Sequence, residues 1–235
     1  MTAVSVAPVA VFGQGDREPY ARALQDGSGT LTLRPDSVDH HGGTVEFDVG
    51  SWCAEASLLE RSLLRNLQGP VLDVGCGPGR LLVAAQLMGL AALGIDTSPE
   101  AVGWARGRGA RALQQSIFSP VPRSGHWQSV ILLDGNIGIG GSVTSLLRRC
   151  RQLIDPSGTL LVEVEADEYL DIVYPAVLED ERGNRSEPFC WARIGRAALE
   201  SRARATGWTV SSAWYLQGRV FCGLSPGPEP VRSIP

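Results

Sequence analysis

The chain has 235 residues, of which 43% are hydrophobic and 20% charged, and its formal net charge is −4. This balance predicts one globular domain rather than a disordered chain, and it disfavours a nucleic-acid substrate because no basic excess is present to neutralise phosphates. All 21 basic residues are arginines, which excludes chemistry that needs a lysine, such as a Schiff base or the phosphate-binding lysine of a P-loop.

The first 68 residues predict an N-terminal extension that could cover a binding site. Two runs of alternating apolar residues, Thr30–Leu33 and Thr44–Val49, predict a β-hairpin. Ser51 is a suitable N-cap, and the apolar residues that follow it recur at helical spacing up to Leu67. This pattern predicts one helix that ends before Gly69.

Strands and helices alternate between residues 69 and 225. In chain order the expected strands are Val71–Val74, Ala91–Ile95, Ala110–Gln114, Val130–Leu133, Thr159–Val164, Thr209–Leu216 and Arg219–Leu224, the last two forming a hairpin. The expected helices are Arg80–Met88, Pro99–Arg108 after the cap Ser98, one after the cap Ser142, and Ile194–Ala205. Residues 165–192 are expected to be an irregular insertion, and residues 226–235 a flexible tail.

This alternation predicts an α/β fold with a mostly parallel sheet covered by helices on both faces. The run Val130–Leu133 is fully apolar, which is typical of a central strand. In such sheets the ligand binds beyond the carboxyl ends of the strands, beside the first strand of the unit.

A glycine-rich loop follows the strand Val71–Val74. It reads Asp73-Val-Gly75-Cys-Gly77-Pro-Gly79, and glycines at alternate positions let the backbone turn sharply and approach a ligand closely. A dinucleotide fingerprint would need a third glycine where Arg80 stands, so that pattern fails. The carboxylate of Asp73 would suit a cofactor that carries a positive amino group and would repel a pyrophosphate.

Asp96 ends the next strand, about 20 positions after Asp73, which is the offset expected for a carboxylate that receives ribose hydroxyls. The loop Asp73–Gly79, Asp96 and the Pro156-x-Gly158 turn before the strand Thr159–Val164 together resemble the class I S-adenosylmethionine-dependent methyltransferases. The resemblance covers about residues 69–165. It implies a Rossmann-like, doubly wound, seven-stranded sheet in three α/β/α layers, with an antiparallel final strand.

The resemblance also implies roles for individual residues toward the cofactor S-adenosyl-L-methionine. Asp73 would orient its amino group, the loop glycines would line its methionine and ribose, and Asp96 would hold the ribose hydroxyls. Many members place an acid after the third strand to contact adenine, whereas this chain has Ser116, Ile117 and Phe118 there. The full set of expected cofactor contacts is Asp73, Gly75, Cys76, Gly77, Gly79, Asp96, Thr97, Ser116, Ile117, Phe118, Asp134 and Gly135.

No catalytic dyad is evident in the sequence, which fits a reaction driven by positioning. The candidates for a catalytic role are Asp134 and Asn136, in a glycine-rich loop after the central strand, and His40 and His41, in a turn of the extension. The family often places a substrate lid after the last parallel strand, so residues 165–192 are a candidate lid of the domain 69–225.

The predicted function is methyl transfer from S-adenosyl-L-methionine to a small molecule. The chain lacks the N-P-P-[YF] signature of enzymes that methylate amino groups of nucleic acids or proteins. Two alternatives stay open: a nicotinamide-dependent oxidoreductase and a non-catalytic S-adenosylmethionine-binding module. No apolar run is long enough to span a membrane, the start of the chain lacks a basic signal region, and the five cysteines are odd in number and widely spaced. A cytoplasmic protein without membrane partner, metal or disulfide framework is therefore expected.

Overall fold

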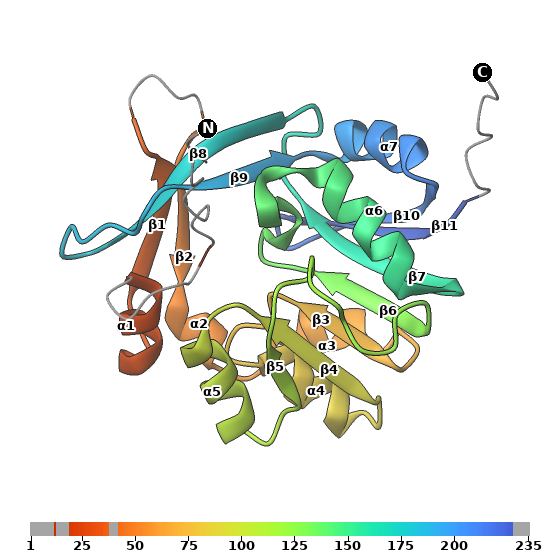
Figure 1. Cartoon of the computed structure of the whole chain (residues 1–235), viewed down its shortest axis with the longest axis horizontal. Helices are drawn as coiled ribbons and strands as arrows, with labels where there is room; N and C mark the ends of the chain where they lie inside the picture. Colours follow the sequence, from red (N-terminus) through yellow and green to blue (C-terminus); the bar gives the residue numbers. More distant parts are fainter. Residues whose placement is uncertain (1–11, 13–18, 38–41, 228–235) are drawn as a thin grey trace, which may run out of the picture.

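The computed structural model describes residues 12, 19–37 and 42–227. Its main body is a seven-stranded sheet with the order β10-β11-β7-β6-β3-β4-β5 (Figure 1). The strands are β3 (Val71–Val74), β4 (Ala92–Asp96), β5 (Ala112–Gln114), β6 (Trp127–Leu132), β7 (Ile154–Val164), β10 (Trp208–Leu216) and β11 (Arg219–Pro226). All neighbours are parallel except β11, which is antiparallel to both β7 and β10. The predicted α/β fold is confirmed, including the central position of the apolar strand β6.

Helices cover both faces of this sheet, because alternate residues of each buried strand point to opposite sides. On one face lie α3 (Leu58–Leu64), α4 (Arg80–Leu87) and α5 (Pro99–Gly107), packed around Val71, Ile131 and Leu161. On the other lie α6 (Val143–Leu153) and α7 (Arg196–Ala205), packed around Leu72, Val130 and Leu160. The caps predicted at Ser98 and Ser142 are confirmed, since each side chain accepts a backbone N–H from its own helix.

The helix predicted from Ser51 to Leu67 is wrong as a single element. The chain forms α2 (Val49–Cys53), breaks, and starts again at α3. Ser57 is the true cap, because its side chain accepts from the backbone of Glu60 while the Glu60 carboxylate accepts from the backbone of Ser57. Such a capping box fixes a helix start more firmly than apolar periodicity does.

A second, four-stranded antiparallel sheet stands beside the first, with the order β2-β1-β8-β9 (Figure 1). Its strands are β1 (Thr30–Pro35), β2 (Val45–Asp48), β8 (Asp171–Asp180) and β9 (Phe189–Ile194). The predicted β1–β2 hairpin is confirmed, but the expectation of an irregular insertion at 165–192 is wrong. We call this element the small sheet. It joins two segments that are far apart in the sequence.

A third apolar cluster holds the small sheet against the main body. It combines Leu31 and Leu33 of β1 and Trp191 of β9 with Leu24 of α1 (Pro19–Asp26) and Ala101 of α5. A short, kinked 3₁₀ segment, η1 (Asn136–Gly141), follows β6 in the chain and packs against β9. Within the described ranges, no helix is long and apolar enough to cross a membrane. The predicted flexible tail lies outside them from residue 228 onward.

Candidate active site

A cavity of about 440 Å³ opens at the carboxyl ends of β3, β4 and β6. The glycine loop and the strand ends form its floor, and aromatic side chains from α1, α2, β2 and β9 form its cover. Of the residues predicted from the sequence, the structure brings together Asp73, Gly75, Cys76, Gly77, Asp96, Thr97, Ser116, Ile117, Phe118, Asp134 and Asn136. Gly79 and Gly135 do not line this cavity.

Gly79 serves packing instead. It begins α4 with a φ of 82°, and a Cβ at this position would lie 2.8 Å from the Cβ of Ala105 on α5. Gly75 permits a different close approach, because a Cβ there would lie within 2.9 Å of the Asn136 side-chain amide. That amide donates from Nδ2 to the carbonyl oxygens of Val74 and Gly75, both at 2.9 Å. Asn136 therefore holds the loop in shape, rather than projecting freely into the cavity.

Asp73 is the unusual group of the cavity. Its side chain is 2% exposed, and Oδ2 has no hydrogen-bond partner. Burial raises the pKa of this carboxyl to about 8, although the nearby positive charge of Arg80 acts in the opposite direction. A buried acceptor without a donor is costly, so this atom indicates a place for a cationic or N–H group that the polypeptide does not supply.

Asp96 ties the glycine loop to the end of β4. Its Oδ2 accepts from the backbone N–H of Gly77 and its Oδ1 from that of Ser98, both at 2.9 Å. Burial raises the pKa of Asp96, while these backbone donors oppose that rise. Each carboxylate oxygen can accept more than one hydrogen bond, so Asp96 retains acceptor capacity toward a ligand in the cavity.

The segment after β5 forms a further part of the cavity wall. Ile117 is 2% exposed and packs into the core, whereas Phe118 is 48% exposed and lies against Gly140 of η1. The hydroxyl of Ser116 accepts from the backbone N–H of Phe118 at 3.2 Å. With Gln115, which also lines the cavity, this part of the wall combines an apolar surface with a hydroxyl and a carboxamide.

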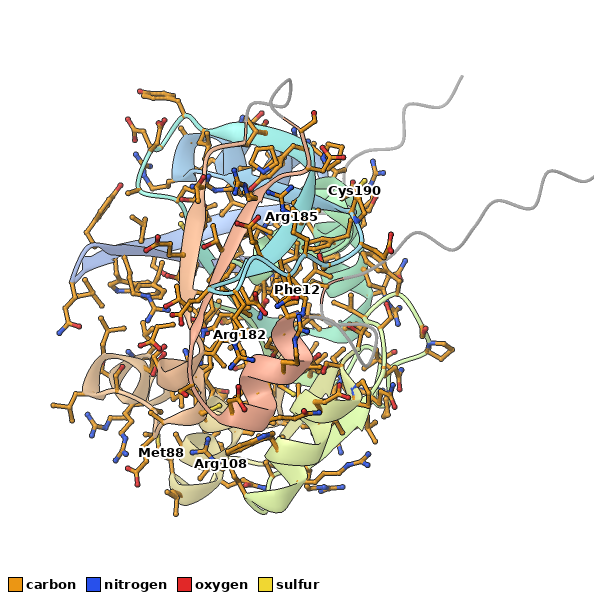
Figure 2. The ribbon with its side chains drawn as sticks, turned by 90° about the vertical axis from the view of Figure 1, so that its left-hand side faces the viewer. Phe12, Met88, Arg108, Arg182, Arg185 and Cys190 are labelled. Atoms are coloured by element: carbon orange, nitrogen blue, oxygen red, sulfur yellow. The ribbon has the colours of Figure 1, made fainter. Side chains whose placement is uncertain are left out.

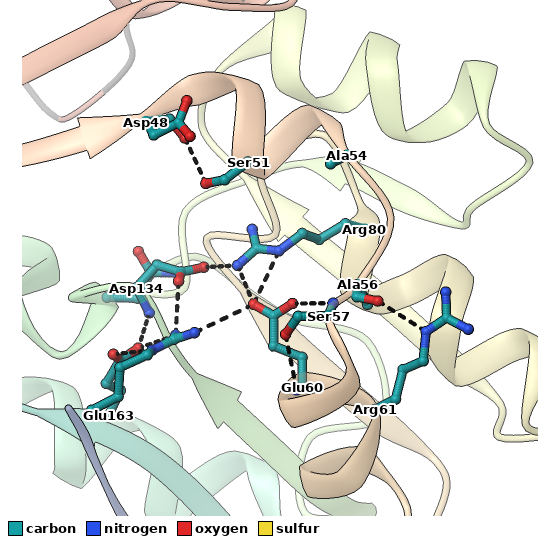
Figure 3. A network of polar contacts seen from close by, with 12 residues as sticks. Asp48, Ser51, Ala54, Ala56, Ser57, Glu60, Arg61, Arg80, Asp134 and Glu163 are labelled. Atoms are coloured by element: carbon teal, nitrogen blue, oxygen red, sulfur yellow. Dashed lines mark hydrogen bonds and ion pairs between the residues drawn. The ribbon is translucent and has the colours of Figure 1, made fainter. Parts of the chain in front are cut away.

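Asp134 is bound into a charged network, which Figure 3 shows from close by. Arg80 donates through Nη2 to Glu60 at 2.6 Å and to Asp134 Oδ2 at 2.7 Å. Arg219 donates to Asp134 Oδ1 at 3.0 Å and to both oxygens of Glu163 at 2.7 Å. We call these five residues the arginine–carboxylate network. Each oxygen of Asp134 thus accepts from one guanidinium, so this residue holds Arg80 and Arg219 in place at the edge of the cavity.

Sequence reasoning missed the other members of this network. Burial favours the neutral form of Glu60, yet its hydrogen bond to Arg80 and the charge of that guanidinium hold its pKa at about 2. Arg80 is 8% exposed and Glu60 4%. In the sequence, the available signal was a charged residue among the apolar ones of each helix, Glu60 in α3 and Arg80 in α4. Only the fold shows that these two side chains meet.

The aromatic cover is centred on Phe12, labelled in Figure 2. Its ring centroid lies 5.2 Å from that of Tyr20, 5.4 Å from Trp191 and 5.6 Å from Phe189. Its carbonyl oxygen accepts from the hydroxyl of Thr97 at 3.0 Å, directly beside Asp96. Sequence analysis did not identify Phe12 as a site residue. The candidates His40 and His41 lie outside the described residues.

A second cavity, of about 350 Å³, adjoins the first. Phe47, Trp52, Asp134 and Trp191 line both, so the two cavities meet at these side chains. The rest of the second cavity lies between the small sheet and the ends of β6 and β7, and its lining includes Gly135. We call the two the floor cavity, at the glycine loop, and the sheet cavity, beneath the small sheet.

Solved structures with a similar fold include methyltransferases. A SAM-dependent methyltransferase from Bacteroides fragilis, in complex with S-adenosyl-L-homocysteine, matches with a TM-score of 0.75 and 21% identity over 94% of this chain and 99% of that one. The CcbJ methyltransferase from Streptomyces caelestis matches with a TM-score of 0.58 and 12% identity over 83% and 96%.

A third match is the Burkholderia thailandensis 1,6-didemethyltoxoflavin-N1-methyltransferase, with bound 1,6-didemethyltoxoflavin and S-adenosylhomocysteine. Its TM-score is 0.54 and its identity 17%, over 76% of this chain and 81% of that one. No curated protein matches the sequence.

The sequence itself matches a family described as "Methyltransferase domain" over residues 51–213, which is more than half of the chain. This match decides against the nicotinamide-dependent oxidoreductase considered above. The glycine loop at the head of a seven-stranded sheet with one antiparallel strand agrees with it. The chain belongs to the methyltransferase domain family.

Proposed function

We propose that this protein transfers a methyl group from S-adenosyl-L-methionine to a small-molecule acceptor, with the donor in the floor cavity and the acceptor beside it. The observation that carries the proposal is the unpartnered, buried Oδ2 of Asp73, which lines a cavity built on a glycine loop and closed at the next strand by Asp96. The family match and the three methyltransferase structures support the same function.

The residues of the floor cavity fit this donor. The orphaned oxygen of Asp73 can accept from an ammonium group, and a cation there would stabilise its ionised form. Gly75 and Gly77 expose backbone at a place where a Cβ would meet Asn136 or the hydroxyl of Tyr20. Asp96 has acceptor capacity for ribose hydroxyls, and the apolar wall at Ile117 and Phe118 suits a flat base.

When bound, S-adenosyl-L-methionine supplies an activated methyl group on a sulfonium. The protein then has to hold an acceptor in line and exclude water, and such positioning can supply roughly 7–11 kcal/mol of a barrier. Trp191 and Phe189, which are 4% and 3% exposed, shield the cavity from solvent together with Phe12. None of these roles requires a general base.

A small acceptor fits the site because the small sheet roofs the strand ends. The sheet cavity, of about 350 Å³, is the size of a small-molecule pocket and adjoins the floor cavity. The 1,6-didemethyltoxoflavin-N1-methyltransferase, whose structure has 1,6-didemethyltoxoflavin and S-adenosylhomocysteine bound, supports a small acceptor.

Calorimetry with S-adenosylhomocysteine tests the proposal. We expect the wild-type protein to bind it and to give no heat with NADH. Asp96→Ala should lower the affinity at least about tenfold, because a hydrogen bond to a charged group contributes about 1.5–3 kcal/mol. Asp26→Ala, an exposed carboxylate at the end of α1, is the matched control and should bind as the wild type does.

Two results would contradict the proposal: a folded wild-type protein that does not bind S-adenosylhomocysteine, or an Asp96→Ala variant with unchanged affinity. Formation of S-adenosylhomocysteine from the methyl donor and an acceptor separates an enzyme from a module that only binds. Tight binding of the donor without any such product, in the presence of acceptors that themselves bind, would favour the binding module.

A further inference from the structure

The guanidinium of Arg80 carries hydrogen-bond donors that the rest of the protein does not use. A guanidinium has five N–H groups, and here Nε donates to Glu60 at 3.1 Å, while Nη2 donates to Glu60 at 2.6 Å and to Asp134 at 2.7 Å. Nη1 has no hydrogen-bond or ion-pair partner among the described residues, and in Figure 3 no dashed line runs from it. Since the side chain is only 9% exposed, the two donors of Nη1 belong to a nearly buried group and lack an acceptor.

These donors are placed at the floor cavity, because Arg80 lines this cavity and does not line the sheet cavity. Among the described lining residues of the floor cavity, Arg80 is the only cation, beside the carboxyl groups of Asp73, Asp96 and Asp134. Asp73 lies in β3, before the glycine loop, and Arg80 is the first residue of α4, after it. One loop is thus flanked by an unpartnered acceptor, Oδ2 of Asp73, and by unpartnered donors on Arg80.

An α-amino-acid group is the complement of this pair. It carries an ammonium and a carboxylate on one carbon atom, so it can satisfy Asp73 and Arg80 together. A simple anion would leave Asp73 unpartnered, and a simple amine would leave Nη1 unpartnered. A carboxylate in this cavity also needs a cation, because it would otherwise face only like charges, and a charge-assisted hydrogen bond to a guanidinium is strong.

We infer that Arg80 is the carboxylate-binding residue of the donor site: its Nη1 donates to the carboxylate at the amino-acid end of S-adenosyl-L-methionine, while Asp73 accepts from the ammonium. Glu60 and Asp134 fix the plane of the guanidinium, so Nη1 is held ready before the donor binds. The inference rests on the proposed function, since it takes the floor cavity to be the donor site. It adds the group that distinguishes the intact donor from a decarboxylated one.

Three ligands that differ only in the amino-acid end test this inference. S-adenosylhomocysteine carries both charged groups, its decarboxylated analogue with an aminopropyl chain lacks the carboxylate, and its deaminated analogue with a carboxypropyl chain lacks the ammonium. Calorimetry measures their binding to the wild-type protein. We expect the decarboxylated analogue to bind at least about tenfold more weakly than S-adenosylhomocysteine, because it loses hydrogen bonds to a charged group.

The variant Arg80→Lys assigns this loss to Arg80. A lysine keeps a positive charge for Glu60 and Asp134 but has no second nitrogen to offer to a ligand. We expect about tenfold weaker binding of the two ligands that carry the carboxylate, and unchanged binding of the decarboxylated analogue. A residue that only stabilised the loop would weaken all three ligands alike. The matched control is Arg61→Lys, since Arg61 also pairs with a carboxylate but lines neither cavity, and it should bind all three as the wild type does.

A crystal structure of the wild-type complex with S-adenosylhomocysteine gives a result that does not depend on the folding of a variant. A carboxylate oxygen should lie within hydrogen-bond distance of Nη1, and a carboxylate bound elsewhere would overturn the inference. Equal binding of S-adenosylhomocysteine and the decarboxylated analogue, or an equal effect of Arg80→Lys on all three ligands, would also overturn it, while the proposed function would stand. Failure of S-adenosylhomocysteine to bind the wild type is a different result, which overturns the proposed function first.

Discussion

A single buried carboxyl, Asp73, makes the stability of this protein depend on pH in an unusual direction. Its pKa is raised by burial from 3.8 to about 8, so between these values the folded state holds a proton that the unfolded state has released. The contribution of this proton to the free energy of unfolding is therefore fully present below about pH 4, and it is lost as the pH rises toward 8.

Asp73→Asn removes this dependence while keeping the shape of the side chain. We expect the free energy of unfolding of the variant, relative to that of the wild type, to increase by about 1 kcal/mol for each pH unit between pH 5 and pH 7. Urea unfolding at several pH values measures it. Asp26→Asn, in an exposed position, should show no such trend. If the free energy of unfolding of Asp73→Asn instead runs parallel to that of the wild type across these pH values, the raised pKa of Asp73 is wrong.

Sequence reasoning identified the floor-cavity residues that follow strands, because position along a parallel sheet fixes where a strand end lies. Asp73 and Asp96 could be assigned in this way. It did not identify Glu60, Arg219 or Phe12, since each comes from another part of the chain and meets the site only through tertiary packing. It named Asp134 as a candidate catalytic group but did not reveal the two guanidiniums, of Arg80 and Arg219, that its oxygens contact.

At the scale of elements, the arginine–carboxylate network connects α3, α4, β7 and β11 to the loop after β6. Glu60→Gln leaves Arg80 buried with a weaker partner, so we expect the free energy of unfolding to fall by about 3 kcal/mol near pH 7, as when other buried ion pairs are broken. In the wild type this stabilisation should be lost as the pH falls from about 4.5 toward 2.

Glu55→Gln is the control for that experiment. Glu55 pairs with Arg61 at 2.7 Å, but its side chain is 84% exposed, so its loss should cost less than about 1 kcal/mol. Chemical denaturation of both variants measures the two effects. If Glu60→Gln and Glu55→Gln lower the free energy of unfolding by equally small amounts, the contact between α3 and α4 does not depend on the ion pair between Glu60 and Arg80.

The contact between η1 and β9 makes a second prediction about elements. A Cβ on Gly138 would lie 2.4 Å from the carbonyl oxygen of Ala192 and 2.5 Å from the Trp191 ring, so Gly138→Ala must push the small sheet away from η1. We expect a loss of about 1–3 kcal/mol in the free energy of unfolding, as for other overpacked sites, together with weaker acceptor binding.

Gly103, within α5, is the matched control because nothing lies within 4 Å of a Cβ built there. Gly103→Ala should stabilise the protein by about 0.5–1 kcal/mol through the higher helix propensity of alanine. Thermal unfolding of the two variants measures the contrast. A Gly138→Ala variant as stable as the wild type would mean that the small sheet is not held by η1.

For the molecule as a whole, the seven-stranded sheet could be predicted because its parallel strands and helices alternate locally along the chain. The small sheet could not, since β1 pairs with β8 through contacts such as Leu31 with Asp180, which no local pattern reveals. Pro175 and the charged ends of β8 further obscure its strand character. The sequence thus indicated a cover from the N-terminal segment with its β1–β2 hairpin, but not the strand β9, whose Phe189 and Trp191 complete it.

The pairing of β1 with β8 also has a consequence during protein synthesis. The β1–β2 hairpin leaves the ribosome long before Asp180 does, and an isolated hairpin is at best marginally stable. Until β8 emerges, the nascent chain therefore exposes an unpaired strand edge that neighbouring nascent chains could capture. Translation that pauses before β8 should consequently favour aggregation, whereas a pause after β9 should not.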